Sequence, residues 1–175
     1  LISPCSSQRY GDQYNRSWSI NNFAELIKYL INLENLQVIM TGGNSPPEQL
    51  YSKELGDLFG NSILNLIGKT SIREMAALIK YSDFIISPDS GPAHIATIMG
   101  KPVIGLYAMS NPKRSGPYNS DEWLINKYDQ ALKVFMDKSP TEVKFGQKIK
   151  QPEAMDLIET RDVIEKVERL IKHES

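Results

Sequence analysis

The residues best suited to chemistry gather in one short stretch, "SPDSGPAH", from Ser87 to His94. It places a carboxylate, hydroxyls, a glycine and an imidazole next to apolar runs on both sides. If a helix begins near Ser90, its unpaired amides and its dipole form an anion site, for which phosphate is the natural occupant. Gly91 would let a phosphate approach the backbone, and Ser90 could add a hydroxyl donor.

Asp89 and His94 suit other roles in the same stretch. Asp89 would repel a phosphate, so it would cap the helix amides, orient a neighbour or accept from a sugar hydroxyl. His94 lies one turn into the predicted helix and could face the same pocket. A plainer interpretation stays open, in which the stretch is only an N-cap and His94 is a packed, hydrogen-bonded residue.

Apolar runs and helical periodicities alternate along the rest of the chain. Strands are predicted at 1–3, 36–40, 63–68, 83–87 and 102–107, and helices over 19–33, 46–59, 71–82, 90–99 and 157–173. This alternation predicts an α/β fold, a Rossmann-like parallel sheet with helices on both faces. Asn21 or Asn22 is expected to cap the first helix, and Ser71 with Glu74 has the spacing of a capping box. The polar run 141–155 is expected to be a surface excursion.

Ligands of such sheets bind at the carboxyl ends of the strands. Four loops there carry suggestive side chains: Arg9 and Arg16 in 4–18, Thr41, Gly42 and Gly43 followed by Glu48, the stretch 88–91, and Lys113 and Arg114 in 108–118. Each loop also has a plainer interpretation: the glycines would only form a turn, Glu48 would be a charge in the first turn of a helix, and the arginines and lysine would be solvated. Their convergence on one sheet edge favours a ligand that carries phosphate.

Composition and missing motifs exclude several other classes. A net charge of −1 in 175 residues argues against binding nucleic acid through general basicity. Cys5 is the only cysteine, and no apolar run approaches a membrane span. The glycine motifs of dinucleotide-binding proteins and of phosphate-loop proteins are missing. The spacing of Asp89, Ser90 and His94 is unlike that of a catalytic Ser-His-Asp triad. No metal site is predicted. The chain begins with Leu1, not Met, and is expected to be a piece of a longer protein.

The segment 87–118, "SPDSGPAHIATIMGKPVIGLYAMSNPKRSGPY", resembles glycosyltransferase family 9, the heptosyltransferase-like enzymes of lipopolysaccharide assembly. Three further stretches are similar to that family: "NRSWSINNFAELI", "VIMTGGNSPPEQ" and "LIGKTSIREMAALIKYSDFIIS". The resemblance covers residues 1–118 and extends to the terminal helix, whereas the run 133–152 matches nothing that can be placed.

The resemblance implies a GT-B architecture, in which two Rossmann-like domains face each other across a cleft. Residues 1–175 would be the C-terminal, donor-binding half of a longer chain. The implied activity transfers a sugar, heptose, from ADP-heptose to a lipopolysaccharide core or related glycan in the bacterial cytoplasm, without a metal or other cofactor. The acceptor site and catalytic base would belong to the missing N-terminal domain, so the isolated chain is expected to bind nucleotide without transferring sugar. Contact with the inner face of the cytoplasmic membrane would come through the acceptor.

The resemblance also implies roles for single residues. The diphosphate would be held by Ser90, Gly91 and Arg16. The nucleoside side would be lined by Thr41, Gly42 and Gly43, and Glu48 would accept a hydrogen bond from the ribose. The candidate catalytic residues would be Asp89, which contacts or orients the sugar, and His94, which supports the loop of Asp89. Two rivals stay open: another GT-B nucleotide-sugar enzyme, epimerase-like and using a UDP-sugar, and a non-catalytic nucleotide-binding module.

Overall fold

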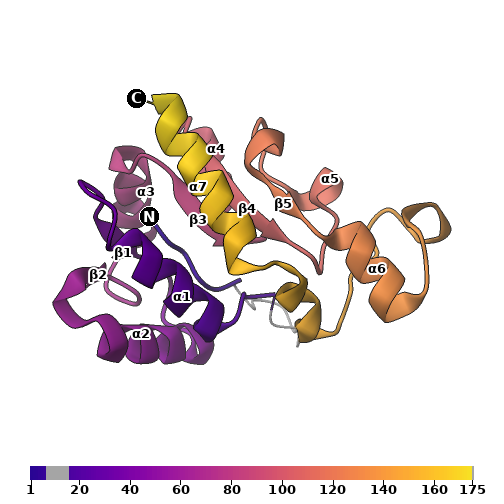
Figure 1. The fold of residues 1–175 in the computed structure, drawn as a ribbon, viewed down its shortest axis with the longest axis horizontal. Coiled ribbons are helices and arrows are strands. Elements are labelled where there is room, and N and C mark those ends of the chain that lie inside the picture. The colour runs from indigo at the N-terminus through magenta and orange to yellow at the C-terminus, as the bar shows by residue number, and fades with distance from the viewer. Residues whose placement is uncertain (7–15, 175) are drawn as a thin grey trace.

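One parallel sheet runs through the chain. The computed structural model describes residues 1–6 and 16–174 (Figure 1). The strands are β1 (Val38–Met40), β2 (Ile63–Asn65), β3 (Ile85–Pro88), β4 (Val103–Tyr107) and β5 (Ile125–Asn126). β1 pairs with β2, and β3 pairs with β4 and β4 with β5, all in parallel. The prediction of a parallel α/β sheet is confirmed.

Ile2 joins the two groups of strands. Its N–H donates to the carbonyl of Ile39 at 2.8 Å, and the N–H of Ser3 donates to the carbonyl of Ile86 at 3.0 Å. The order across the sheet is therefore β2, β1, Ile2, β3, β4, β5. The chain first winds outward from Ile2 to β2 and then returns to β3, so the strand order reverses between Ile2 and β3. This reversal is the point at which doubly wound sheets bind their ligands.

Helices cover both faces of the sheet. Side chains of α1 (Ile20–Leu30), α2 (Pro46–Phe59) and α7 (Thr160–Glu174) share a core with Ile86 and Ile104 on one face. On the other face, α3 (Ile72–Tyr81) and α4 (Gly91–Ile98) pack around Ile85 and Val103. Figure 1 shows α7 crossing β3 and β4 on the near side, with α4 behind them. None of the helices in the described residues combines the length and apolar character that crossing a bilayer demands.

Shorter elements complete the chain beyond β4. They are α5 (Pro112–Ser115), α6 (Tyr128–Met136) and the 3₁₀ helices Asp121–Trp123, Pro140–Glu142 and Pro152–Leu157, with another, Gly60–Ser62, ahead of β2. β5 and α6 were not predicted from the sequence. The run 141–155 is only partly the expected surface excursion, because Ile149, Ala154 and Met155 are buried in the core.

Two helix starts test the capping predictions. Ser71 and Glu74 form the predicted capping box of α3, with Ser71 Oγ accepting from the Glu74 N–H at 3.3 Å. The prediction for the first helix is wrong, because the N-cap is Ser19, whose Oγ accepts from the Asn22 N–H at 3.2 Å. Asn22 therefore lies inside the first turn.

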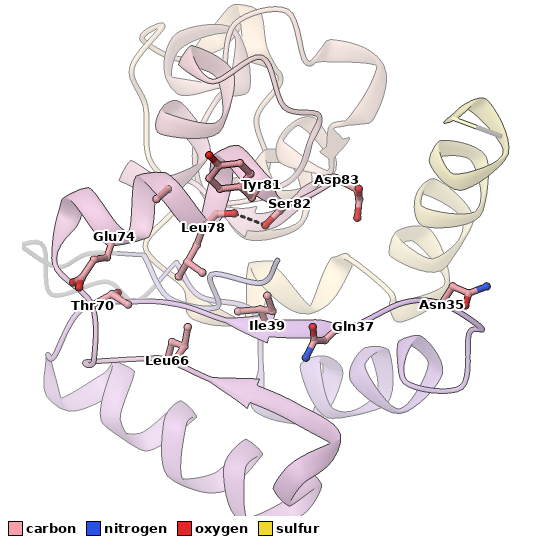
Figure 2. A pocket seen from close by; sticks show the side chains of 11 residues that line it. Asn35, Gln37, Ile39, Leu66, Thr70, Glu74, Leu78, Tyr81, Ser82 and Asp83 are labelled. Carbon is pink, nitrogen blue, oxygen red and sulfur yellow. Dashed lines mark hydrogen bonds between the residues drawn. The ribbon is translucent and has the colours of Figure 1, made fainter.

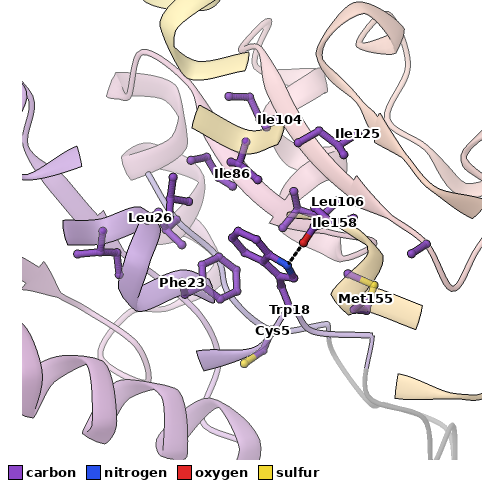
Figure 3. Close-up of a cluster of buried hydrophobic side chains, with 14 of the residues drawn as sticks. Cys5, Trp18, Phe23, Leu26, Ile86, Ile104, Leu106, Ile125, Met155 and Ile158 are labelled. Carbon is purple, nitrogen blue, oxygen red and sulfur yellow. Dashed lines mark hydrogen bonds between the residues drawn. The ribbon is translucent and has the colours of Figure 1, made fainter. Parts of the chain in front are cut away.

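Trp18 anchors the larger core, as Figure 3 shows. It is fully buried, and its ring meets that of Phe23 edge-on at 5.1 Å between centroids. Its indole N–H donates to the carbonyl of Ile158 at 2.9 Å. The backbone carbonyl of Trp18 accepts from the Tyr51 hydroxyl at 2.5 Å. These bonds fix the chain two residues after Arg16.

Candidate functional site

Asp89 lies at the carboxyl end of β3, beside the point where the strand order reverses. Its Oδ2 accepts hydrogen bonds from the hydroxyls of Ser110, at 2.7 Å, and Ser115, at 3.1 Å. The Nη1 atom of Arg16 lies 3.8 Å from the same oxygen. Asp89 is therefore tied to the loop after β4 and to the loop after the first strand. It does not cap the amides of α4, which corrects one of the roles expected for it.

Arg16 is held in place from both sides. Its backbone N–H donates to Ser6 Oγ at 3.1 Å, and the N–H of Ser6 donates to Ser17 Oγ at 3.0 Å. Trp18 then anchors the following backbone in the core. The side chain of Arg16 is only 17% exposed, so its charge is directed into the site, where water screens it less than at an open surface. Arg9, the other cation expected in this loop, falls outside the described residues.

The N-terminus of α4 is open. Ser90 occupies the N-cap position with extended backbone, and its Oγ lies 2.6 Å from Ser87 Oγ. No side chain in the part of the chain that the structure describes caps this helix. A Cβ built on Gly91 would meet no atom of the described residues within 4 Å. The first amides of α4 and the positive end of its dipole therefore face space that an anion can enter.

The Gly-Gly loop after β1 is organised by Glu48. Oε1 of Glu48 accepts from the Gly43 N–H at 2.6 Å, while Oε2 accepts from the N–H of Ser45 at 2.9 Å and from its hydroxyl at 2.5 Å. A Cβ on Gly43 would stand 2.9 Å from Oε2, and one on Gly42 3.3 Å from Oε1. Both glycines allow this close approach. Glu48 is thus a capping carboxylate of α2, and its role toward a ribose stays a prediction.

Thr41 and His94 contribute less directly. Thr41 is fully buried, and its Oγ1 has no hydrogen-bond partner among the described residues. His94 is exposed on α4, and within residues 1–6 and 16–174 no hydrogen bond joins it to the Asp89 loop. The support expected from His94 comes instead from Ser87, Ser110 and Ser115.

A small polar cavity of about 230 Å³ opens beside Asp89. Its lining brings together the loops after the first strand, β3 and β4 with a segment from the run that could not be placed: Arg16, Asp89, Ser110, Asn111, Arg114, Ser115, Gly146, Gln147 and Lys148. The last three residues were missed by sequence reasoning. The sequence feature that could have indicated them is a glycine within the basic run "KFGQKIK". That run shows neither helical nor strand periodicity.

Hydrogen bonds fix that missed segment against the sheet edge. The N–H of Ile149 donates to the Met109 carbonyl at 2.9 Å, which extends the line of β4. The Tyr128 hydroxyl of α6 donates to the Gln147 carbonyl at 2.7 Å. Residues 146–148 therefore form a wall of the cavity.

A larger hollow of about 510 Å³ shares no lining residue with this cavity and lies between α3 and the segments around β1 and β2 (Figure 2). Figure 2 shows Leu78 and Tyr81 on α3 above Ile39 and Leu66. Its charged lining residues are both acidic, Glu74 and Asp83. An anionic ligand would be repelled there, so size alone does not make this hollow the phosphate site.

Tyr107 is buried at the end of β4, where the charges of Asp89 and Arg16 both act on it. Burial raises the pKa of its hydroxyl, the Asp89 carboxylate raises it further, and the Arg16 guanidinium partly opposes both. The hydroxyl donates to the Ser115 carbonyl at 3.3 Å. Tyr107 therefore stays neutral and supports the loop that holds Asp89.

Metal ligands do not gather at this site. Within the described part of the chain, no group of three or more His, Cys, Asp or Glu side chains is arranged to hold a metal ion. Among the described residues, Arg16, Arg114 and Lys148 are the cationic side chains that line the cavity, and the dipole of α4 adds positive charge beside it.

Comparisons with known proteins agree with the fold. Over 170 residues the chain is 35% identical to the lipopolysaccharide core heptosyltransferase OpsX of Haemophilus influenzae, covering 97% of this chain and 47% of that protein. The solved structure of E. coli ADP-heptose lps heptosyltransferase II matches with a TM-score of 0.70 at 21% identity, covering 99% of this chain and 46% of that one. The iron-containing heptosyltransferase TibC, solved with ADP-D-β-D-heptose, matches with a TM-score of 0.60 at 14% identity, covering 98% and 45%.

The chain spans about half the length of the curated relatives it matches. Residues 1–143 match the sequence profile of glycosyltransferase family 9 (heptosyltransferase), which is most of the chain. The expected resemblance is thus confirmed, and the chain belongs to glycosyltransferase family 9.

Proposed function

We propose that residues 1–175 are the donor-binding domain, the C-terminal half of a longer GT-B glycosyltransferase chain that transfers heptose from ADP-heptose to a lipopolysaccharide core or related glycan. The observation that carries the proposal is the uncapped N-terminus of α4, with Arg16 and Asp89 beside it at the reversal of the strand order. The names of OpsX and of the solved heptosyltransferases support the sugar, the donor and the acceptor.

The diphosphate would lie against the start of α4. The first amides of the helix and the Ser90 hydroxyl would donate to its oxygens, and Arg16 would neutralise part of its charge. Gly91 allows this approach because, in the part of the chain that the structure describes, no atom lies within 4 Å of where a Cβ would stand. The nucleoside would extend toward Thr41, Gly42 and Gly43, along the carboxyl ends of the neighbouring strands.

The same groups would promote the reaction. When the sugar–phosphate bond breaks, negative charge builds on the departing nucleoside diphosphate. Fixed donors at that position stabilise the transition state more than the ground state. Asp89, held by Ser110 and Ser115, would face the sugar and orient its hydroxyls. The acceptor hydroxyl needs a base, which we place in the other half of the full-length enzyme.

The acceptor would also come from outside this chain. Because a lipopolysaccharide core is attached to a lipid, we propose that the full-length enzyme works at the cytoplasmic surface of the membrane without spanning it. We further propose that donor binding needs no metal, since cationic side chains and the helix dipole supply the positive charge. Binding of ADP should then be the same with and without a chelator such as EDTA.

Calorimetric titration of the chain with ADP and with UDP tests the proposal. We expect saturable binding of ADP, weaker binding of UDP, and no sugar transfer by the chain alone. Preference for UDP would favour the epimerase-like alternative. Binding of neither nucleotide at millimolar concentration would contradict the proposed function.

A further inference from the structure

We infer that Ser87 is a positioning residue of the donor site, which draws the hydroxyl of Ser90 away from the start of α4 and so leaves an amide of that helix free for the diphosphate. This inference rests on the proposed function, because it takes the diphosphate to bind at the start of α4. Ser87 itself is fully buried and would act only through Ser90.

Ser90 occupies the N-cap position of α4 without capping the helix. A serine there, with extended backbone, ordinarily accepts a hydrogen bond from the second or third amide of the helix. The second residue of α4 is Pro92, which has no N–H, so the amide that Ser90 could cap is that of Ala93. Ser90 Oγ makes no such bond and lies 2.6 Å from Ser87 Oγ instead.

Two other helices begin with a serine that does cap. Ser19 of α1 and Ser71 of α3 each accept from the third amide of their helix, at 3.2 Å and 3.3 Å. Neither has a serine or threonine three residues earlier in the sequence, whereas Ser90 follows Ser87 at that distance. The missing cap of α4 therefore goes with the neighbouring hydroxyl and not with the residue type at the N-cap.

The strand β3 places Ser87 close to the start of α4. Side chains alternate along a strand, so Ser87 lies on the same face as Ile85, which shares the smaller core with Ala93 of α4. Because Ser87 is fully buried, its hydroxyl needs partners within the protein. It donates to the Pro88 carbonyl at 3.1 Å, and a hydroxyl carries one proton, so Ser90 is the donor between the two serines.

The two hydroxyls can rearrange when the diphosphate binds. If Ser87 turns its proton from the Pro88 carbonyl to Ser90 Oγ, Ser90 donates its own proton to a phosphate oxygen. The Ala93 amide, which Ser90 does not occupy, is a second donor to the same group. Without Ser87, Ser90 would accept from the Ala93 N–H, and a phosphate would have to displace this cap.

Hydrogen exchange and ADP titration of serine variants test this role. In ligand-free Ser87→Ala, Ser90 should cap Ala93, so exchange of the Ala93 amide in the ¹⁵N-labelled chain should slow about threefold or more, and ADP affinity should fall by a similar factor. In a Ser90→Ala background, Ser87→Ala should change neither quantity further, because no hydroxyl remains to be held.

Two more variants complete the experiment. Ser87→Cys keeps the shape of the side chain with a weaker hydrogen-bonding group, so it should shift both quantities in the same direction by less. It also serves if Ser87→Ala does not fold. Ser82→Ala is the matched control, because this serine precedes the other end of β3 and its hydroxyl donates to the Leu78 carbonyl at 2.7 Å. It should leave both quantities unchanged.

The outcomes separate this role from a structural one. If Ser87→Ala and Ser87→Cys leave the Ala93 exchange rate or the ADP affinity at its native value, the inference is wrong. If Ser87→Ala lowers ADP affinity equally with and without the Ser90 hydroxyl, its effect does not pass through Ser90, and the inference is also wrong. If the native chain binds no ADP, the proposed function fails, whereas Ala93 exchange that slows only when Ser90 is present would still establish that Ser87 holds Ser90 away from the helix.

Discussion

The guanidinium of Arg16 lies 3.8 Å from the carboxylate of Asp89, and both side chains are mostly buried. The two residues follow neighbouring strands of the sheet, on either side of the reversal in strand order. A buried charge pair costs desolvation, so it is weak evidence for a stabilising role. Beside the uncapped N-terminus of α4, the pair instead fixes one positive and one negative group at the place where a diphosphate and a sugar would meet.

Replacing Arg16 by Ala should weaken ADP binding by roughly 1.5–3 kcal/mol, the range for hydrogen bonds to charged groups. Arg16→Lys keeps the charge and should lose less. Calorimetric titration measures both. Arg161→Ala is the control, because this exposed arginine pairs with Glu159 away from the sheet edge. An Arg16→Ala chain that binds ADP as tightly as the native chain would remove Arg16 from the site.

The sheet and the start of α4 were predictable because their signals are local. Short apolar runs alternate with amphipathic periods, and Ser71 with Glu74 forms the capping box that its spacing indicates. The start of α4 at Gly91 follows the predicted position within one residue. These features depend on neighbours in sequence, and the order of strands then brings their loops to one edge.

The remaining parts depend on contacts between distant segments. Asp89 is held by Ser110 and Ser115, which no spacing rule connects with it. Lys148 enters the cavity because Ile149 pairs with Met109. β5 has only two residues, too few for a period, and the exposed position of His94 depends on how α4 packs.

Trp18→Phe should destabilise the fold by about 1–3 kcal/mol. It leaves the buried carbonyl of Ile158 without the indole donor and removes part of a packed ring. Urea unfolding measures the change. Trp123→Phe is the control, because Trp123 is only partly buried, and it should cost clearly less. Equal losses in the two variants would contradict the anchoring role of Trp18.

Stability at high pH should depend on Cys5. Burial raises the pKa of its thiol from 9.0 to about 12. Above pH 9 the unfolded chain loses this proton while the folded chain keeps it, so the free energy of unfolding falls as pH rises, by at most about 1.4 kcal/mol per unit. Unfolding in urea at pH 8, 9 and 10 should show a shallower fall for Cys5→Ala. Parallel curves for the two proteins would contradict the burial of the thiol.

Gly91→Ala should separate binding from stability. A Cβ there meets nothing within 4 Å, so the unfolding free energy should stay the same or rise by about 0.4–1 kcal/mol. The methyl group would occupy the space through which a phosphate reaches the helix amides, so ADP affinity should fall at least tenfold. Gly100→Ala is the converse control: its φ of +69° strains any other residue, so stability should fall while ADP affinity holds. If Gly91→Ala binds ADP normally, the diphosphate does not lie against the start of α4.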